Sequence, residues 1–213
     1  MAGLWPLHGI RLRAGAVELR ALTEPDLDSL AGLLPTDVEQ DPAATRYVAL
    51  DAGANRSAVL AQSYWRAMGL WSPADWALPL VVSAEGRVVG VQWLEGPDYP
   101  SDRVVDSSSW LVPEARGHGL GTQMRRAVLE LAFGHLGAVA AISSAVVGND
   151  GSLGVSRSLG YVATHTSLLA HSGEMLQHLR LERATWLASG RGAGVEVVGV
   201  EAALPLFGVG ERP

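Results

Sequence analysis

The sequence predicts a single α/β domain built around a mixed β-sheet. Paired runs at 10–20 and 78–94 alternate apolar and polar residues, which indicates two strand hairpins. Helix-patterned runs follow or separate the later strands, and a glycine-rich segment at 116–122 opens one of them. Strands and helices that alternate in this order are typical of an α/β protein.

The N-terminal part is expected to form a hairpin followed by two helices. Ile10–Arg13 and Val17–Arg20 each alternate apolar and charged residues on either side of a short turn. Thr23 is the expected cap of the first helix, because a proline and two acidic residues follow it. The segment 34–55 is rich in turn residues and is expected to be a loop. A second helix is expected over Arg56–Leu70.

The remaining elements alternate between strands and helices. Leu78–Ser83 and Arg87–Leu94 are expected to form the second hairpin. Arg103–Leu111 and Ala138–Val147 are expected strands, and Gly119–Leu136 between them has the apolar stripe of a helix.

The most informative stretch is the glycine-rich run at the start of that helix. Glycine lets the backbone approach a ligand closely, and the amides at a helix start attract an anion. Alone, the run leaves a phosphate site and a plain turn as alternatives. It lacks the G-x-G-x-x-G spacing of a dinucleotide site, and the chain has no lysine for a P-loop. The run reads Arg116-Gly117-His118-Gly119-Leu120-Gly121-Thr122.

This run resembles the R-x-x-G-x-G signature of the GCN5-related N-acetyltransferase (GNAT) family. A second block, with Asn149 and Ser152 followed by Leu159-Gly160-Tyr161, is similar to the family's N-x-x-S/A … L-G-F/Y element. The second block by itself also fits an ordinary capped helix. The resemblance implies a mixed, mostly antiparallel central sheet that is splayed between two parallel strands and flanked by helices.

The resemblance covers most of the chain and is strongest for the RimJ/RimL-type branch. Val17–Leu27 looks like the opening strand and helix of that branch, and Leu179–Trp186 looks like its closing strand and helix. At a finer level the chain is similar to mycobacterial RimL-like succinyltransferases. The short segments that carry this finer similarity are Trp5–Leu7, Asp75–Leu80, Val105–Leu111 and Pro205–Gly208.

The resemblance implies a coenzyme A thioester, acetyl-CoA or succinyl-CoA, as acyl donor, and we expect no metal. The amides of the run 116–122 would hold its pyrophosphate, and Asn149 and Ser152 would contact its pantetheine arm. The thioester would enter the gap between the two parallel strands, where the amide of Leu111 or Val112 would face its carbonyl. A succinyl carboxylate would also need a cation, for which Arg103 is a candidate, with a surface role as the alternative.

Direct attack of an amine on a thioester needs a base and an acid. Asp106, on the strand that enters the site, is the candidate general base or amine-orienting carboxylate; the alternative is a solvated or serine-paired aspartate. Ser152 and Ser156 are candidates to protonate the leaving thiolate, with Ser152 ranked first; capping or packing is their alternative. Many family members carry a tyrosine where Ser156 stands, which leaves the acid open.

Aromatic and histidine side chains are the candidates to contact the acceptor. Trp71 and Trp76 lie in the segment that walls the acceptor site in this family, and core packing is the favoured alternative. His165, His171 and His178 fall in or near the late strands, and His165 is the first choice among them. None of the histidines has a convincing metal-ligand spacing.

Composition limits the class of protein. A chain of 213 residues with 48% hydrophobic residues can bury the core of one domain, taken here as 1–213. There is no cysteine, no signal peptide and no apolar run long enough to cross a membrane, so we expect a cytoplasmic protein. A net charge of −6 argues against nucleic-acid binding.

We therefore expect an N-acyltransferase that acts on a primary amine of a small molecule or a peptide N-terminus. A protein N-terminal acetyltransferase of the ribosomal-protein type and a non-catalytic acyl-CoA-binding module are the alternatives. We expect a homodimer. The glycine-rich tail 190–213 is expected to add a strand or an oligomer contact.

Overall fold

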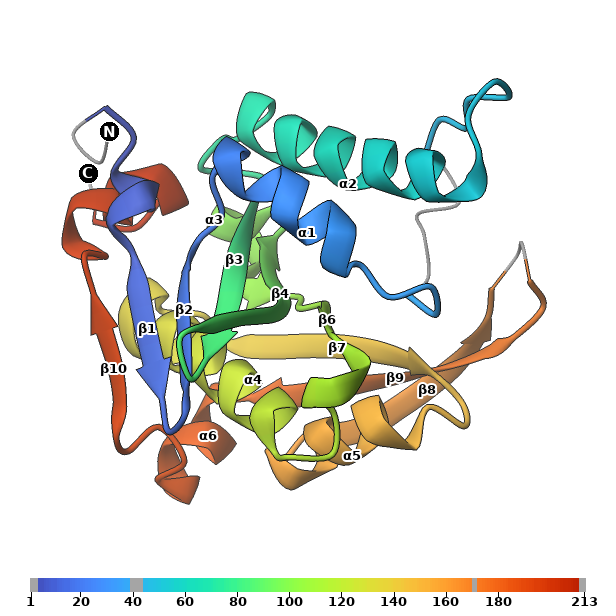
Figure 1. The fold of residues 1–213 in the computed structure, drawn as a ribbon. Helices are drawn as coiled ribbons and strands as arrows, with labels where there is room; N and C mark the ends of the chain where they lie inside the picture. The colour runs from blue at the N-terminus through green and yellow to red at the C-terminus, as the bar shows by residue number, and fades with distance from the viewer. Residues whose placement is uncertain (1–3, 39–43, 170–171, 211–213) are drawn as a thin grey trace.

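A computed structural model shows two β-sheets that meet at segment 104–111 (Figure 1). It describes residues 4–38, 44–169 and 172–210. The strands are β1 (Arg11–Ala14), β2 (Val17–Ala21), β3 (Trp76–Ala84), β4 (Arg87–Gly96), β5 (Val104–Val105), β6 (Ser109–Leu111), β7 (Ala140–Val146), β8 (Val162–Leu168), β9 (Met175–Glu182) and β10 (Val195–Val198). The six-stranded sheet has the order β10-β1-β2-β3-β4-β6, and the four-stranded sheet has the order β5-β7-β9-β8.

Nearly all strand pairs are antiparallel, as the predicted fold requires. The two expected hairpins form, with β1 paired to β2 and β3 paired to β4. Strand β10 of the C-terminal tail pairs with β1 and becomes the outer strand of the larger sheet. Between the named strands, the only parallel pair that the described residues form is β5 with β7.

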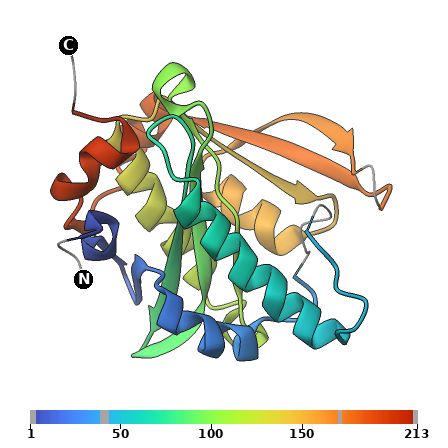
Figure 2. The same cartoon turned by 90° about the horizontal axis from the view of Figure 1, so that it is seen from above.

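Helices cover both faces of the larger sheet (Figure 2). Helices α1 and α2 pack on one face around a cluster that includes Leu30, Leu60 and Val81. Helix α4 packs on the other face, in a larger cluster that also receives the C-terminal tail. The helices and helical turns are η1 (Pro6–Gly9), η2 (Glu24–Asp26), α1 (Leu27–Leu33), α2 (Ala52–Gly69), α3 (Tyr99–Asp102), η3 (Pro113–Ala115), α4 (Leu120–Glu130), the π-helical η4 (Leu131–Leu136), α5 (Asp150–Ser158), α6 (Arg183–Ser189) and η5 (Glu201–Phe207).

Two expected element boundaries are wrong, and each has a local cause. Helix α2 begins at Ala52, because the Asp51 carboxylate accepts the Ala54 amide at 2.8 Å and caps it, so the expected loop over 34–55 is shorter. The expected strand Arg103–Leu111 is two strands, β5 and β6, which belong to different sheets.

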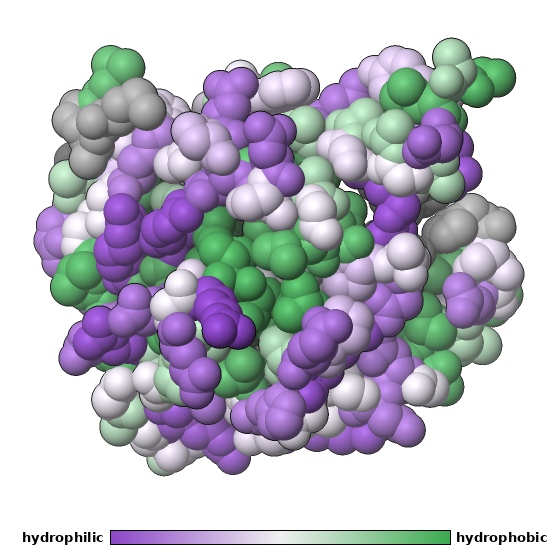
Figure 3. Space-filling model, viewed as in Figure 1, coloured by the Kyte–Doolittle hydropathy of each residue, from purple (hydrophilic) through white to green (hydrophobic). Residues whose placement is uncertain are grey.

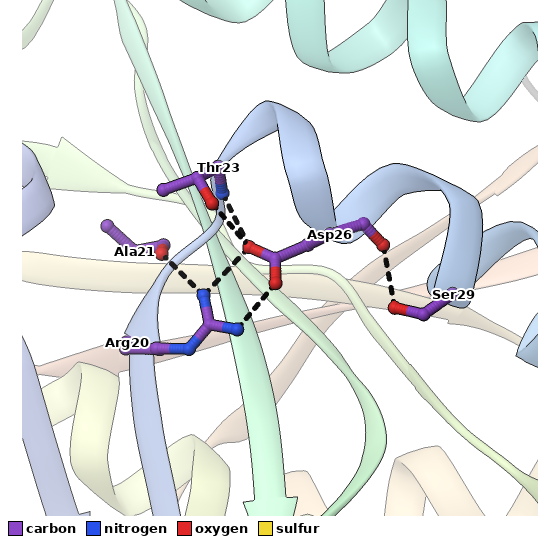
Figure 4. Close-up of polar contacts among 5 residues, drawn as sticks. All are labelled: Arg20, Ala21, Thr23, Asp26 and Ser29. Atoms are coloured by element: carbon purple, nitrogen blue, oxygen red, sulfur yellow. Dashed lines mark hydrogen bonds and ion pairs between the residues drawn. The ribbon is translucent and has the colours of Figure 1, made fainter.

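The junction between β2 and α1 is held by one carboxylate (Figure 4). Asp26 accepts two hydrogen bonds from the Arg20 guanidinium, at 2.7 and 2.5 Å. It also accepts the Thr23 amide at 2.9 Å and the Thr23 hydroxyl at 2.8 Å, which confirms Thr23 as the cap. Burial raises the pKa of Asp26, but the hydrogen bonds from Arg20 and Thr23 outweigh it and lower that pKa to about 2.

Candidate functional site

A gap opens where the two sheets meet. Strands β5 and β7 pair in parallel only at Val104 with Ala140 and at Val105 with Ala141. Beyond that point β6 pairs with β4, and β7 continues beside β9, so β6 and β7 diverge. The predicted splay of two parallel strands is confirmed, although only two residue pairs hold them together.

The glycine loop lies beside this gap, at the start of α4. Gly117 and Gly119 have φ values of +77° and +75°, which side chains with a Cβ rarely adopt. Neither glycine has an atom within 4 Å of the place where a Cβ would stand, and His118 is exposed. The backbone of this loop is therefore open to a ligand.

Gly121 is a glycine for a different reason. It lies inside α4, and a Cβ there would come 3.3 Å from Val155 Cγ2 of α5. The missing Cβ of Gly121 therefore makes room for the packing of α5 against α4 and not for the pyrophosphate. Leu120 and Thr122, on either side of it, are half-buried in the first turn of α4.

The Arg116 side chain, which precedes the glycine loop, bonds to two other segments of the chain. Its Nε donates to the Leu111 carbonyl at 3.0 Å. Its two terminal nitrogens donate to both oxygens of Asp37, at 2.5 and 2.9 Å, in a segment 79 residues away in the chain. Arg116 therefore links β6 to the segment that follows α1 and does not point freely at the loop.

Leu111 and Val112 have different backbone roles. The Val112 amide donates to the Val89 carbonyl at 2.9 Å, so it is already used within the larger sheet. Successive amides of an extended strand point to opposite sides, so the Leu111 amide points away from β4 and toward the gap. Of the two expected partners for a thioester carbonyl, the geometry favours Leu111.

The second motif forms the start of α5. The Asn149 side-chain oxygen accepts the Ser152 amide at 3.1 Å, which is an N-cap. Ser152 is half-buried in the first turn. Ser156 is 1% exposed inside α5, so it is a core residue and a poor candidate acid.

Two half-buried carboxylates lie side by side at the end of β4. The backbones of Glu95 and Asp106 exchange two hydrogen bonds of 2.9 Å, so their side chains lie on the same face of the sheet. Burial, and then the neighbouring charge of Asp106, raises the pKa of Glu95. Burial also raises the pKa of Asp106, against opposing effects that include the amide of Ser107, which donates to Asp106 at 2.6 Å. Sequence reasoning missed Glu95, for which the only signal is an acidic residue near the end of a mostly apolar strand.

Histidines of β8 and β9 also contribute to this region. The rings of His165 and His178 stack 4.3 Å apart with an angle of 4° between their planes. The His178 Nε2 is 2.7 Å from the Ser167 hydroxyl, and the charge of His178 acts on Asp106. His165 is exposed, and His171 lies outside the described residues. Figure 3 shows apolar side chains between α1 and α4, inside a border of hydrophilic ones.

Trp71 and Trp76 belong to the core. Their rings stack 6.0 Å apart, and both contact Phe207 of the C-terminal tail. Trp71 Nε1 donates to the Leu206 carbonyl at 2.8 Å, and Trp76 is only 2% exposed. Both tryptophans therefore pack in the core and hold the C-terminal tail in place. The prediction that they contact an acceptor is wrong.

Arg103 lies beside the end of η4, away from the glycine loop. Its guanidinium is 3.5 Å from the Leu136 carbonyl, at the end of η4, and lies 5.9 Å from the centre of the Tyr99 ring. The glycine loop is at the opposite end of the same helix.

Neither a metal centre nor a membrane span is evident. Across the described ranges, no three histidine, aspartate or glutamate side chains are grouped so that they could hold a metal ion. Within these ranges too, no helix combines the length and apolar character needed to cross a membrane.

The family follows from a match that spans β2, the hairpin of β3 and β4, the glycine loop and the second motif. Residues 16–162 match the model of the acetyltransferase (GNAT) domain. The chain belongs to the GNAT acetyltransferase family. Members of this family use acyl-CoA.

Solved structures of GNAT proteins share the fold. The structure of Mycobacterium smegmatis RimJ in complex with CoA-disulfide has a TM-score of 0.64 at 15% identity, and the match covers 87% of this chain and 97% of that one. The spermidine N-acetyltransferase of Vibrio cholerae, solved with CoA and spermine, has a TM-score of 0.62 at 14% identity, with 81% and 98% covered. At this level of identity the similarity establishes the fold alone.

Proposed function

We propose that the protein transfers an acyl group from acetyl-CoA or succinyl-CoA to a primary amine by direct attack on the thioester. The observation that carries this proposal is the gap between β6 and β7, with the open glycine loop beside it. A thioester in the gap would meet the Leu111 amide, while Gly117 and Gly119 leave the loop amides free to bind phosphate.

Asp106 is the proposed base or ammonium-orienting group. It is a largely buried carboxylate whose pKa is raised by burial, so a proton can move to it more readily than to an ordinary aspartate. Glu95 beside it adds a second negative charge that favours a cationic amine. Ser152 remains the proposed acid for the leaving thiolate, since the Ser156 side chain is in the core.

The proposed acceptor is a primary amine, and the two kinds considered are a small molecule and a peptide N-terminus. His178 acts electrostatically on Asp106 and carries His165 stacked on its ring, and the face in Figure 3 offers apolar surface for a neighbouring group. A small-molecule amine and a peptide N-terminus both fit this chemistry. A non-catalytic acyl-CoA-binding role is the alternative, which the raised pKa of the half-buried Asp106 disfavours.

Release of free thiol tests the proposal. The protein is mixed with acetyl-CoA or succinyl-CoA and a panel of diamines, amino acids and short peptides, and the acylated product is confirmed by mass spectrometry. We expect thiol release that depends on amine for at least one donor. Tight CoA binding by calorimetry without turnover of any amine would support the non-catalytic alternative.

A further inference from the structure

A buried arginine, Arg125 of α4, has no carboxylate in contact with it. It is only 4% exposed, and its Nη1 donates to the Ser143 hydroxyl of β7 at 3.2 Å. In the part of the chain that the structure describes, it forms no ion pair, and its Nε has no hydrogen-bond partner. An arginine stays charged in a protein, and burying a charge is costly unless an opposite charge acts on it. An anion bound beside Arg125 would offset that cost.

Two further buried hydroxyls lie near this guanidinium with unused hydrogen-bonding capacity. The hydroxyls of Ser107 and Tyr161 have no hydrogen-bond partner among the described atoms. Burial raises the pKa of Tyr161, and the nearby Arg125 and Ser107 oppose that increase. A buried polar atom usually has a partner, so these side chains can bind one more polar group. We call Arg125, Ser107, Ser143 and Tyr161 the Arg125 cluster.

The sheet register places the Arg125 cluster at the narrow end of the gap. Val105 lies beside Ala141 in the last pair before β5 and β7 separate, so Ser107 and Ser143 come next to each other where the gap begins. Val105 packs in the core cluster that contains α4, and side chains alternate along a strand, so Ser107 also faces α4. The same alternation places Asp106 on the opposite face of the strand.

The backbone of the gap leads toward this cluster. The Ser108 carbonyl and the Val112 amide bond to β4, so alternation leaves the Ser109 amide, like that of Leu111, on the gap side. A thioester carbonyl on either amide would lie roughly 7 to 13 Å from Ser107 along the strand, at about 3.3 Å per residue. An acyl chain that continues toward the narrow end of the gap therefore approaches the buried guanidinium.

We propose that the Arg125 cluster is a subsite for a carboxylate at the far end of the donor's acyl group. The proposal rests on the proposed function, which brings an acyl-CoA into the gap, and it selects the CoA thioester of a dicarboxylic acid over acetyl-CoA. The guanidinium would hold the carboxylate by charge-assisted hydrogen bonds, and the hydroxyls would donate to its remaining lone pairs. An acetyl group has no atom that could accept these bonds. Arg103, the cation first expected in this role, lies away from the glycine loop beside the Leu136 carbonyl.

Calorimetry with two matched thioesters tests this without turnover. Succinyl-CoA and butyryl-CoA have acyl chains of similar length, and only the first ends in a carboxylate. We expect the wild type to bind succinyl-CoA at least roughly 10-fold more tightly, and Arg125→Met to bind both about equally. Arg126→Met is the matched control and should keep the preference, because Arg126 donates to the Arg191 and Ala193 carbonyls of the tail.

Equal affinities for the two thioesters in the wild type would overturn the proposal. So would a preference for succinyl-CoA that survives in folded Arg125→Met. The preference should also persist at high salt, because buried charges are screened little; its loss there would place the carboxylate on an exposed arginine and contradict the proposal. If Arg125→Met does not fold, Tyr161→Phe decides. It removes one hydroxyl and keeps the ring, and it should lower the preference by roughly 3-fold or more; an unchanged preference would contradict the proposal.

Turnover separates this proposal from the proposed function. With an accepted amine, the ratio of kcat/KM for succinyl-CoA to that for acetyl-CoA should fall by roughly 10-fold or more in Arg125→Met. Acylation of an amine from acetyl-CoA, together with equal binding of succinyl-CoA and butyryl-CoA, would remove the subsite alone. Succinyl-CoA binding that depends on Arg125, without acylation of any amine, would remove the proposed transfer alone. Binding of no thioester would overturn both.

Discussion

Two aspartates of this molecule, Asp26 and Asp106, have opposite surroundings. At the junction of β2 and α1, Asp26 receives four hydrogen bonds from Arg20 and Thr23, and its pKa falls to about 2. At the gap, Asp106 is half-buried and accepts the Ser107 amide at 2.6 Å, it forms no ion pair within the described residues, and burial raises its pKa. A carboxylate with complete hydrogen bonding resists protonation and stabilises a helix start. One that is desolvated and incompletely bonded stays available for proton transfer.

The largest expected effect separates the two sites by activity. Asp106→Asn should lower turnover by roughly 10²- to 10⁴-fold while CoA affinity is kept, because the amide cannot accept the amine proton. Steady-state kinetics and calorimetry on the same preparation measure this. Asp26→Asn serves as the control and should retain its turnover. A pH–rate profile unchanged by Asp106→Asn would make Asp106 a structural residue like Asp26.

The glycine loop, unlike the two aspartates, is expected to bind CoA through its backbone amides alone. Gly119→Val should weaken CoA binding by roughly 100-fold, because it strains a residue at φ +75° and places a side chain over the amides. Gly86→Val is the matched control, since Gly86 has φ +74° and equally open space in the turn between β3 and β4.

Both glycine variants should lose similar stability in denaturant unfolding, and only Gly119→Val should lose affinity by calorimetry. Wild-type affinity in Gly119→Val would mean that CoA binds elsewhere.

The Asp26 site should show its role in stability and in pH dependence. Asp26→Asn should lower the free energy of unfolding by about 1–2 kcal/mol at pH 7, a value reduced for the partial exposure of the pair. The folded pKa is depressed, so this contribution is complete above the unfolded pKa and is lost as the pH falls through about 2. Urea unfolding between pH 7 and pH 2 measures it.

The two sites should respond to acid with opposite sign. The pKa values of Glu95 and Asp106 are raised, so each charge opposes folding at neutral pH, and that cost disappears as the pH falls. Glu95→Gln should therefore keep or slightly raise the stability at pH 7, unlike Asp26→Asn. A clear loss of stability in Glu95→Gln would mean that the carboxylate is bonded in the way that Asp26 is.

The smallest effect concerns Arg116 and Asp37, an exposed ion pair. Hydrogen bonding to Arg116 lowers the pKa of Asp37, although both side chains are well exposed. Asp37→Asn should change stability little, and it should tighten CoA binding only a few-fold at low salt, by freeing Arg116 for a phosphate. Calorimetry at two salt concentrations checks it. Affinity that falls in Asp37→Asn would show instead that the pair holds the loop in its binding shape.

Local chemistry determined much of this protein from its sequence. Turn residues and the alternation of apolar and polar residues predicted the two hairpins. Thr23 predicted the start of the first helix, and the spacing of Gly117 and Gly119 predicted the loop. Each of these features depends on neighbours within a few residues, so the sequence order already contains it.

Only the tertiary structure decided which distant residues meet. It split the expected strand Arg103–Leu111 between two sheets, and it placed Trp71 and Trp76 against Phe207 rather than an acceptor. It also brought Glu95 of β4 beside Asp106. Such contacts depend on sheet register and on the packing of the two faces, which no short stretch of sequence specifies.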